Sequence, residues 1–498
     1  MKNITVVGGG TAGWFTALLV KEYYPHADIT LVESEEIGIL GAGEGTTPHF
    51  MSLLKEIKIS LTEVIREADA TIKNGIRFIN WNGDGKGYFH SFNPDDNLNQ
   101  FTNFTVLVAQ IKEYQRLVDI DYACKITDFD LVPFTLDKSK INYGQDPFTF
   151  FTKSSSFGIH FNARKFAQFL SKVAQNRGIT RIEGKITEIY NDEQGNVKSL
   201  KIDTQQDVLE CDFVFDCSGF ARLFLGKHYN IPWQDYSDVL PMNTGLPFFI
   251  QHDNNVTPET KSIAMKYGWI WQIPVRDRYG CGYVFDSNYI NEDQALEEAE
   301  EYFGMKLTVP KVFKFRAGSF TKTLHKNCLA IGLSQSFVEP LEATSLWVAY
   351  SNLSDFLNSN GLFVKSEVFQ KVYNERCLRK NNDVRDFLYF HYLTKRNDSP
   401  FWQEFRNKHN MIPSLSDDLD LINQFSNMKL NNTLFGNGSF MQVGYGLGLI
   451  DEKNYEKTFD LIEREFARNL RDNSENQQNL VLQTCWSHRA FIDFLSDR

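Results

Sequence analysis

A cluster of glycines near the start of the chain could bind the pyrophosphate of a dinucleotide. Gly8, Gly10 and Gly13 fit the pattern G-x-G-x-x-G and end an apolar run, ITVVGGG, that reads as a strand. The first glycine of this pattern permits a tight turn, the second lets the backbone approach the phosphates, and the third lets a helix pack closely on the strand. Thr11 and Ala12 open that helix, so its first N–H groups would face the phosphates.

Two further segments extend this dinucleotide site. Glu33 ends a second short strand twenty residues after Gly13, where an acid would bind ribose hydroxyls. The G-x-G-x-x-G pattern alone does not distinguish NAD from FAD. The segment DFVFDCSGF, with Ser218 and Gly219, resembles the second nucleotide contact of FAD-dependent hydroxylase-like proteins and favours FAD. No second G-x-G-x-x-G occurs, which favours one FAD and reduced flavin from a separate reductase. Some one-domain flavin hydroxylases nevertheless bind NAD(P)H without a second fingerprint, so that alternative stays open.

Composition excludes several classes of protein. The chain has 498 residues, of which 42% are hydrophobic and 23% charged, as in a soluble globular protein. A net charge of −11 argues against a general nucleic-acid binder. The seven cysteines are scattered without a C-x-x-C pair, so we predict no disulfide framework and no metal site. No signal peptide or membrane span is predicted, and the expected location is the cytoplasm.

The elements that must position these residues predict an α/β fold. Strand, helix and strand follow one another at the start of the chain, His160 to Gly178 reads as a helix, and GWIWQIP (268–274) reads as a strand with both tryptophans on one face. Pro340 reads as a helix start, and the pattern then stays mostly helical. We expect a Rossmann-like FAD-binding module of residues 1–47, 150–235 and 310–350, an inserted β-rich substrate and tunnel region of 48–149 and 236–309, and a helical C-terminal region of 351–498.

Several motifs in order resemble the flavin-dependent tryptophan halogenase family. W-x-W-x-I-P at 269–274 matches the signature of that family. GGGTAGW, GAGEGTTP, HFNARKFAQFL, SFVEPLEATSL and DSPFW resemble further family segments along nearly the whole chain. Gly45 stands where the family usually has Ala, and Asn162 where it usually has Asp.

The resemblance implies two catalytic residues. Lys73, in TIKNGIRFINW, aligns with the active-site lysine of the family, and Glu342, in the PLE segment, aligns with its active-site glutamate. By composition alone Lys73 would be a solvated surface lysine, and Glu342 a first-turn acid that complements a helix dipole. The resemblance also implies flavin contacts at Gly43, Glu44, Gly332 and Leu333. Leu333 stands where flavin hydroxylases commonly carry an Asp, which favours halogenase over hydroxylase.

A halide site is implied at the amides of Thr344 and Ser345, because a helix start attracts an anion. Tryptophan-specific members read P-L-E-S-T-G here, whereas this chain reads P-L-E-A-T-S. Ser345 therefore replaces a glycine beside the halide, so the halide preference stays open among bromide, chloride and iodide, a larger halide included. By their spacing alone the two tryptophans would be core residues of a strand, whereas the resemblance implies a barrier that keeps the arene from the flavin; it comprises Trp269, Trp271, Ile273 and Pro274.

The resemblance implies that reduced FAD, dioxygen and halide generate hypohalous acid, which halogenates a small indole or phenol. Two alternatives stay open: a FAD-dependent aromatic monooxygenase, and a flavoprotein without small-molecule turnover. The expected partners are the arene, a halide and a flavin reductase, with neither nucleic acid nor membrane; a homo-oligomer stays open.

Overall fold

The chain forms two compact units in the computed structural model, which describes residues 2–36, 44–92, 157–252, 256–408, 412–423, 430–450 and 488–496. The first unit comprises Met1–Ala68, Phe161–Pro241 and Arg316–Arg385. The second comprises Asp69–His160, Met242–Phe315 and Asp386–Arg498. Each unit therefore gathers stretches that lie far apart in the sequence.

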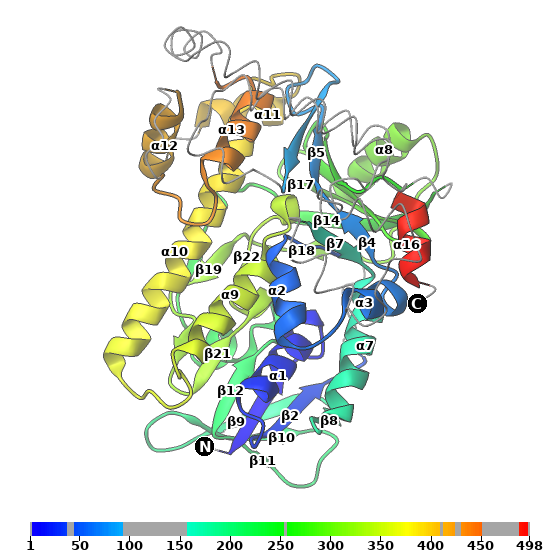
Figure 1. Ribbon diagram of the computed structural model, residues 1–498. Helices are drawn as coiled ribbons and strands as arrows, with labels where there is room; N and C mark the ends of the chain where they lie inside the picture. Colours follow the sequence, from blue (N-terminus) through cyan, green and yellow to red (C-terminus); the bar gives the residue numbers. More distant parts are fainter. Residues whose placement is uncertain are drawn as a thin grey trace, which may run out of the picture. The chain divides into compact units, whose positions relative to one another are not determined.

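A six-stranded sheet, in the order β20-β21-β12-β1-β2-β8, forms the base of the first unit (Figure 1). Its neighbouring strands are parallel except β20 and β21. The strands are β1 (Asn3–Val7), β2 (Asp28–Glu33), β8 (Thr180–Glu183), β12 (Phe213–Asp216), β20 (Leu324–His325) and β21 (Cys328–Ala330). Strands of a parallel sheet are covered on both faces, which explains the unbroken apolar runs of β1 and β12. The predicted strand–helix–strand start is confirmed.

Helices surround this sheet. They are α1 (Thr11–Tyr23), α2 (His49–Glu56), α3 (Leu61–Glu67), α7 (Ala163–Asn176) and α9 (Ser345–Asn358). Helix α1 packs against both α7 and α9 (Figure 1). The shorter strands of this unit are β3 (Glu44–Gly45), β9 (Ile186–Asn191), β10 (Val197–Ile202), β11 (Leu209–Glu210), β13 (Trp233–Asp235), β19 (Gly318–Phe320) and β22 (Ser336–Phe337).

Helix α7 begins later than the sequence predicted. His160 and Phe161 belong to strand β7 (Gly158–Phe161), so the helix starts at Ala163. The Asn162 side chain caps it by accepting a hydrogen bond from the N–H of Lys165 at 3.2 Å. Asn and Asp are equally good caps, so Asn162 keeps the role that an aspartate would have there.

The helix predicted from Pro340 is also corrected. Pro340–Glu342 form only a single 3-10 turn, and Ala343 ends it in the left-handed conformation with φ of 54°. Helix α9 starts afresh at Ser345, with Thr344 at its N-cap. The restart places the first free N–H groups of α9 at the predicted halide residues.

A seven-stranded sheet, in the order β18-β14-β17-β16-β15-β5-β6, dominates the second unit. Its pairs are antiparallel except β15 with β5. The strands are β5 (Gly75–Ile79), β6 (Gly87–Ser91), β14 (Thr244–Gln251), β15 (Thr260–Ala264), β16 (Gly268–Pro274), β17 (Arg278–Phe285) and β18 (Phe313–Lys314). Strand β16 coincides with the predicted strand GWIWQIP. The short strand β4 (Thr71–Lys73) pairs antiparallel with β7.

The helices of the second unit are α8 (Glu292–Phe303), α11 (Pro400–Lys408), α12 (Pro413–Asn423), α13 (Asn437–Gly446) and α16 (His488–Ser496). Ala295 and Ala299 of α8 pack on the apolar face of the sheet, beside Phe248, Ile270 and Tyr283. Helix α10 (Glu367–His391) starts in the first unit and ends in the second. The described part of the chain after Thr344 contains α-helices and no strand, which confirms the predicted helical C-terminal region.

Two sequence-based expectations concern the environment of the protein. Among the described residues no helix has both the length and the apolarity needed to cross a bilayer. The described cysteines are all buried and free of disulfides: Cys211, Cys217, Cys281, Cys328 and Cys377. Cys124 and Cys485 lie outside the described residues.

Candidate active site and cofactor site

The glycine turn between β1 and α1 is closely packed on one side and open on the other. Gly8 has φ of 118°, and a Cβ there would overlap the carbonyl of Cys217. A Cβ at Gly13 would overlap the carbonyl of Gly8. A Cβ at Gly10 would meet nothing within 4 Å, and Gly10, at the N-cap of α1, has no side chain to cap the helix. The turn thus offers space and N–H groups for a phosphate at Gly10, Thr11 and Ala12.

Glu33 lies at the end of β2, with its carboxylate directly over Gly9. The sequence did not predict its partner: Arg181 of β8 donates from Nε to Glu33 Oε1 at 2.6 Å. Burial raises the pKa of Glu33, and the Arg181 guanidinium opposes that shift. Arg181 also bonds Glu35 and Glu183, so three carboxylates share one guanidinium. The hint in the sequence was the alternation R-I-E in β8 beside an acidic strand end.

Ser218 and Gly219 follow β12 and lie beside the glycine turn. The carboxylate of Asp216 accepts hydrogen bonds from the N–H groups of Ser218 at 3.0 Å and Phe224 at 3.1 Å. These bonds fold the chain tightly after β12, and the backbone N of Ser218 comes close to Gly8. Gly219 has φ of 64°, a conformation that glycine adopts without strain.

Glu44, in β3, is the part of the predicted flavin-contacting segment that the structure describes, whereas Gly43 lies outside the described residues. Burial raises the pKa of Glu44 to about 7, and the nearby hydroxyl of Thr11 opposes the shift. Glu44 therefore lies near the first residue of α1 and changes its charge close to neutral pH.

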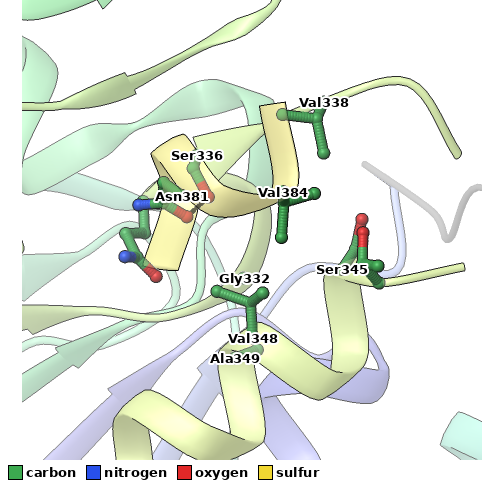
Figure 2. A pocket seen from close by; sticks show the side chains of 10 residues that line it. Gly332, Ser336, Val338, Ser345, Val348, Ala349, Asn381 and Val384 are labelled. Atoms are coloured by element: carbon green, nitrogen blue, oxygen red, sulfur yellow. Dashed lines mark hydrogen bonds between the residues drawn. The ribbon is translucent and has the colours of Figure 1, made fainter. Parts of the chain in front are cut away.

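A pocket of the first unit brings Gly332 together with Thr344 and Ser345 (Figure 2). Gly332 has φ of 72° and lies against Ala12 at the start of α1, so the pocket lies next to the glycine turn. Leu333, in the same 3-10 turn, is not among the residues that line the pocket. The remaining lining residues, which the sequence did not single out, are Gln335, Ser336, Val338, Val348, Ala349, Asn381 and Val384.

The polar side chains of this pocket are held by hydrogen bonds. Ser336 donates from Oγ to Asn381 Oδ1 at 3.1 Å, and Asn381 donates from Nδ2 to Ser319 Oγ at 2.8 Å. Asn381 comes from α10, nearly forty residues after Ser345, so no local pattern could have placed it there.

The N-terminus of α9 is fixed by an aromatic stack. Trp347, in its first turn, stacks on His49, the first residue of α2, with ring centroids 4.3 Å apart and planes at 12°. At the other end of α2, Tyr350 of α9 donates to Glu56 at 2.5 Å. These two contacts hold the first turns of α9 against α2.

Lys73 lies in the second unit, and its side chain is 0% exposed. This burial is the reverse of what the composition alone indicated, because lysine is almost never fully buried. The ammonium lies over the ring of Phe92, 5.0 Å from its centroid, an arrangement that stabilises a cation. The side chain of Glu342 is also buried, at 1% exposed, but it lies in the first unit.

The aromatic strand β16 packs its two tryptophans together. Trp269 and Trp271 have ring centroids 6.4 Å apart in an edge-to-face arrangement. Trp269 is 1% exposed and donates from Nε1 to the hydroxyl of Tyr392 at 3.1 Å. The ring of Trp271 covers Gly282 of β17 so closely that a Cβ there would overlap it. Ile273 and Pro274 are buried at the end of the strand.

Asn74, which follows Lys73, is a polar residue that the sequence analysis missed. Its backbone bonds Pro258 and Phe92, but the Nδ2 and Oδ1 atoms of its buried side chain make no hydrogen bond with the described residues. A buried amide without partners costs stability, so it marks a place where a ligand could supply them. The signal was an asparagine inside an apolar strand pattern.

We expect Asn74→Leu to raise the free energy of unfolding by about 1 kcal/mol, because the substitution removes buried polar atoms that lack partners. Denaturant melts of the ligand-free protein measure this change. The matched control is Asn381→Leu, which breaks two hydrogen bonds and should destabilise the protein. A loss of stability in Asn74→Leu as large as in the control would contradict this reading of Asn74.

Comparison with known proteins gives one consistent result. A family model described as tryptophan halogenase matches residues 3–462. Tryptophan 7-halogenase RebH of Lentzea aerocolonigenes is 32% identical over 427 residues, which cover 80% of this chain and 78% of that protein.

Solved structures agree in fold. A flavin-dependent halogenase from Xanthomonas campestris is 26% identical with a TM-score of 0.82, over 99% of this chain and 98% of that one. BrvH, a flavin-dependent halogenase from Brevundimonas sp. BAL3, is 27% identical with a TM-score of 0.80, over 99% of each chain. These matches confirm the predicted FAD-binding halogenase fold, and the chain belongs to the tryptophan halogenase family of flavin-dependent enzymes.

Proposed function

We propose that this enzyme halogenates a small arene of the indole or phenol type, with Lys73 directing hypohalous acid and Glu342 accepting the ring proton. The complete burial of Lys73 carries the proposal. Burying an ammonium costs free energy, and proteins keep such buried charges mainly at functional sites. The name of the 7-halogenase relative, which specifies tryptophan, supports an aromatic substrate.

FAD is the cofactor that the first unit would hold. Its pyrophosphate would lie at Gly8, Gly10, Thr11, Ala12 and Gly13, and its ribose at Glu33. Further contacts would come from Gly43, Glu44, Ser218, Gly219, Gly332 and Leu333. The open space at Gly10 and the free start of α1 suit a phosphate. The chemistry that bound, reduced FAD from a separate reductase would supply, together with dioxygen, is the two-electron oxidation of halide to hypohalous acid.

The proposed transfer uses one acid and one base. The ammonium of Lys73 donates a hydrogen bond to the oxygen of hypohalous acid, which makes the halogen more electrophilic. A ring carbon bonds the halogen while the halogen–oxygen bond breaks, and the oxygen takes a proton from Lys73 to leave as water. Glu342 stabilises the cationic ring and then removes its proton, so arene and hypohalous acid give haloarene and water.

Replacement of the lysine tests this function directly. In a reaction with FAD, a flavin reductase, NADH, bromide and a panel of indoles and phenols, Lys73→Ala should lose at least about a hundredfold in halogenated product. FAD binding should remain, because Lys73 lies outside the unit that holds the glycine turn. Lys86→Ala, which replaces an exposed lysine of the same unit, is the control and should keep full activity. Full activity of Lys73→Ala would refute the assignment of the lysine, and halide-independent hydroxylation by the wild type would establish a monooxygenase.

The proposed halide site lies at the amides of Thr344 and Ser345, where α9 begins. Ser345 adds a side chain to the wall of this pocket where a glycine would leave more room, so we expect it to take part in the selection among chloride, bromide and iodide. Ser345→Gly widens the site and should shift the ratio of kcat/KM for bromide and chloride toward bromide by about tenfold, the scale of a small change in a pocket wall. Competition assays measure the ratio, and Ser345→Ala separates the hydroxyl from the Cβ. An unchanged ratio in both variants would remove Ser345 from halide selection.

The aromatic strand β16 is proposed to keep the arene away from the flavin while a small oxidant passes. Gly282→Ala would push the ring of Trp271 out of place, and Trp269→Ala with Trp271→Ala removes both rings. Either change should let hydroxylated product appear beside haloarene in product analysis by mass spectrometry. Gly245→Ala is the control, since a Cβ there makes only ordinary contacts. If the variants lose stability without hydroxylated product, these rings serve the core alone.

A further inference from the structure

Strand β4, which carries Lys73, is held mainly by side chains from distant segments. It spans only Thr71–Lys73 and pairs with β7, where Thr71 lies opposite His160. A strand this short has few backbone hydrogen bonds of its own, so the side chains that bond it decide where Lys73 lies. Two of them are buried histidines, His160 and His488, which the proposed chemistry does not use.

The bonds of Thr71 fix the tautomer of His160. Thr71 donates its single hydroxyl hydrogen to the carbonyl of Pro274 at 2.7 Å, because a carbonyl can only accept. The Thr71 oxygen must then accept from Nδ1–H of His160, 3.1 Å away. In the neutral ring Nε2 is left as an acceptor, and the hydroxyl of Thr260 lies 2.9 Å from it. A directed chain of hydrogen bonds thus runs from Thr260 through His160 and Thr71 to Pro274, the last residue of β16.

His488 holds the next residue of the strand. Its Nδ1–H donates to the carbonyl of Val256 at 2.8 Å, and its Nε2 accepts from the N–H of Ile72 at 3.0 Å. A ring that donates at Nδ1 and accepts at Nε2 is neutral. His488 starts α16 and lies beyond residues 3–462, the part of the chain that the family model matches.

Both histidines suit a place beside a buried ammonium because both are neutral. Burial, and then the charge of Lys73, lower the pKa of His160 well below its ordinary value. Burial lowers the pKa of His488 to about 4, against the opposing bond to Val256. Neither ring therefore adds a second positive charge near Lys73 in the neutral pH range.

We propose that His160 and His488 are positioning residues for Lys73: together they fix Thr71 and Ile72, and His160 orients the Thr71 hydroxyl that bonds Pro274 at the end of the tryptophan strand. This inference rests on the proposed role of Lys73. A displaced lysine would meet hypohalous acid in the wrong geometry, so the oxidant would form but escape. This pair of histidines, which we call the clamp, thus governs the fraction of oxidant that reaches the arene. The proposed FAD site lies in the other unit.

The test measures two products in one reaction: haloarene, and free hypohalous acid captured by a β-diketone trap. His160→Leu and His488→Leu should lower the ratio of haloarene to trapped oxidant by about tenfold at equal flavin consumption. His160→Gln, which keeps one donor and one acceptor, should restore part of the ratio. The matched control is His252→Gln, a histidine of the same unit that bonds the carbonyl of Val275 and should keep the wild-type ratio.

Two results would overturn the clamp. One is a wild-type ratio in the leucine variants with lower total turnover and lower Tm, since a merely structural role reduces both products alike. The other is unchanged hydrogen exchange at Ile72 in His488→Leu, where loss of the acceptor should speed exchange. The exchange measurement needs no turnover, so it tests the clamp even if the wild type makes no haloarene. Absence of haloarene in the wild type would refute the proposed function and not the clamp. If the leucine variants do not fold, the glutamine variants supply both measurements: a smaller loss of ratio and a smaller gain in exchange are expected, and wild-type values of both would overturn the proposal.

Discussion

The burial of the Lys73 ammonium is the constraint on which the second unit depends. A charge removed from water needs stabilising groups nearby, and a second positive charge beside it would destabilise it further. The ring of Phe92 faces the ammonium, and the two histidines that hold β4 are neutral. The same hydrogen bonds that set the tautomer of His160 end at Pro274, so the lysine strand and the strand of Trp269 share one support.

In the first unit the positive electrostatic potential that would bind anions comes mainly from the backbone and not from cationic side chains. Backbone N–H groups at the starts of α1 and α9 provide that potential, one at the glycine turn and one at the proposed halide site. Carboxylates surround it at Glu33 and Glu44, where burial raises the pKa of each. The contact of Gly332 with Ala12 joins both helix starts within one unit, as a cofactor that reaches from pyrophosphate to halide would require.

Local patterns in the sequence predicted a large part of this arrangement. The strand–glycine–helix start and the strand GWIWQIP follow from short-range periodicity, and both are confirmed. The helix expected at Pro340 was wrong because Ala343 adopts a left-handed conformation that residue types do not reveal. Arg181, Asn381 and His488 were missed for another reason: each acts on residues far away in the sequence, up to 416 positions in the contact between His488 and Ile72. Composition also could not predict the burial of Lys73, because lysine side chains are usually exposed at the surface.

The central claim is that a small halogen oxidant, and not an oxygen of the cofactor, reaches the arene at Lys73. The most direct measurement is mass spectrometry of the product formed by the wild type under isotopically heavy dioxygen, with and without bromide. We predict a brominated arene that carries no heavy oxygen, and no product without bromide. An arene that carries heavy oxygen and forms equally well without bromide would contradict the claim.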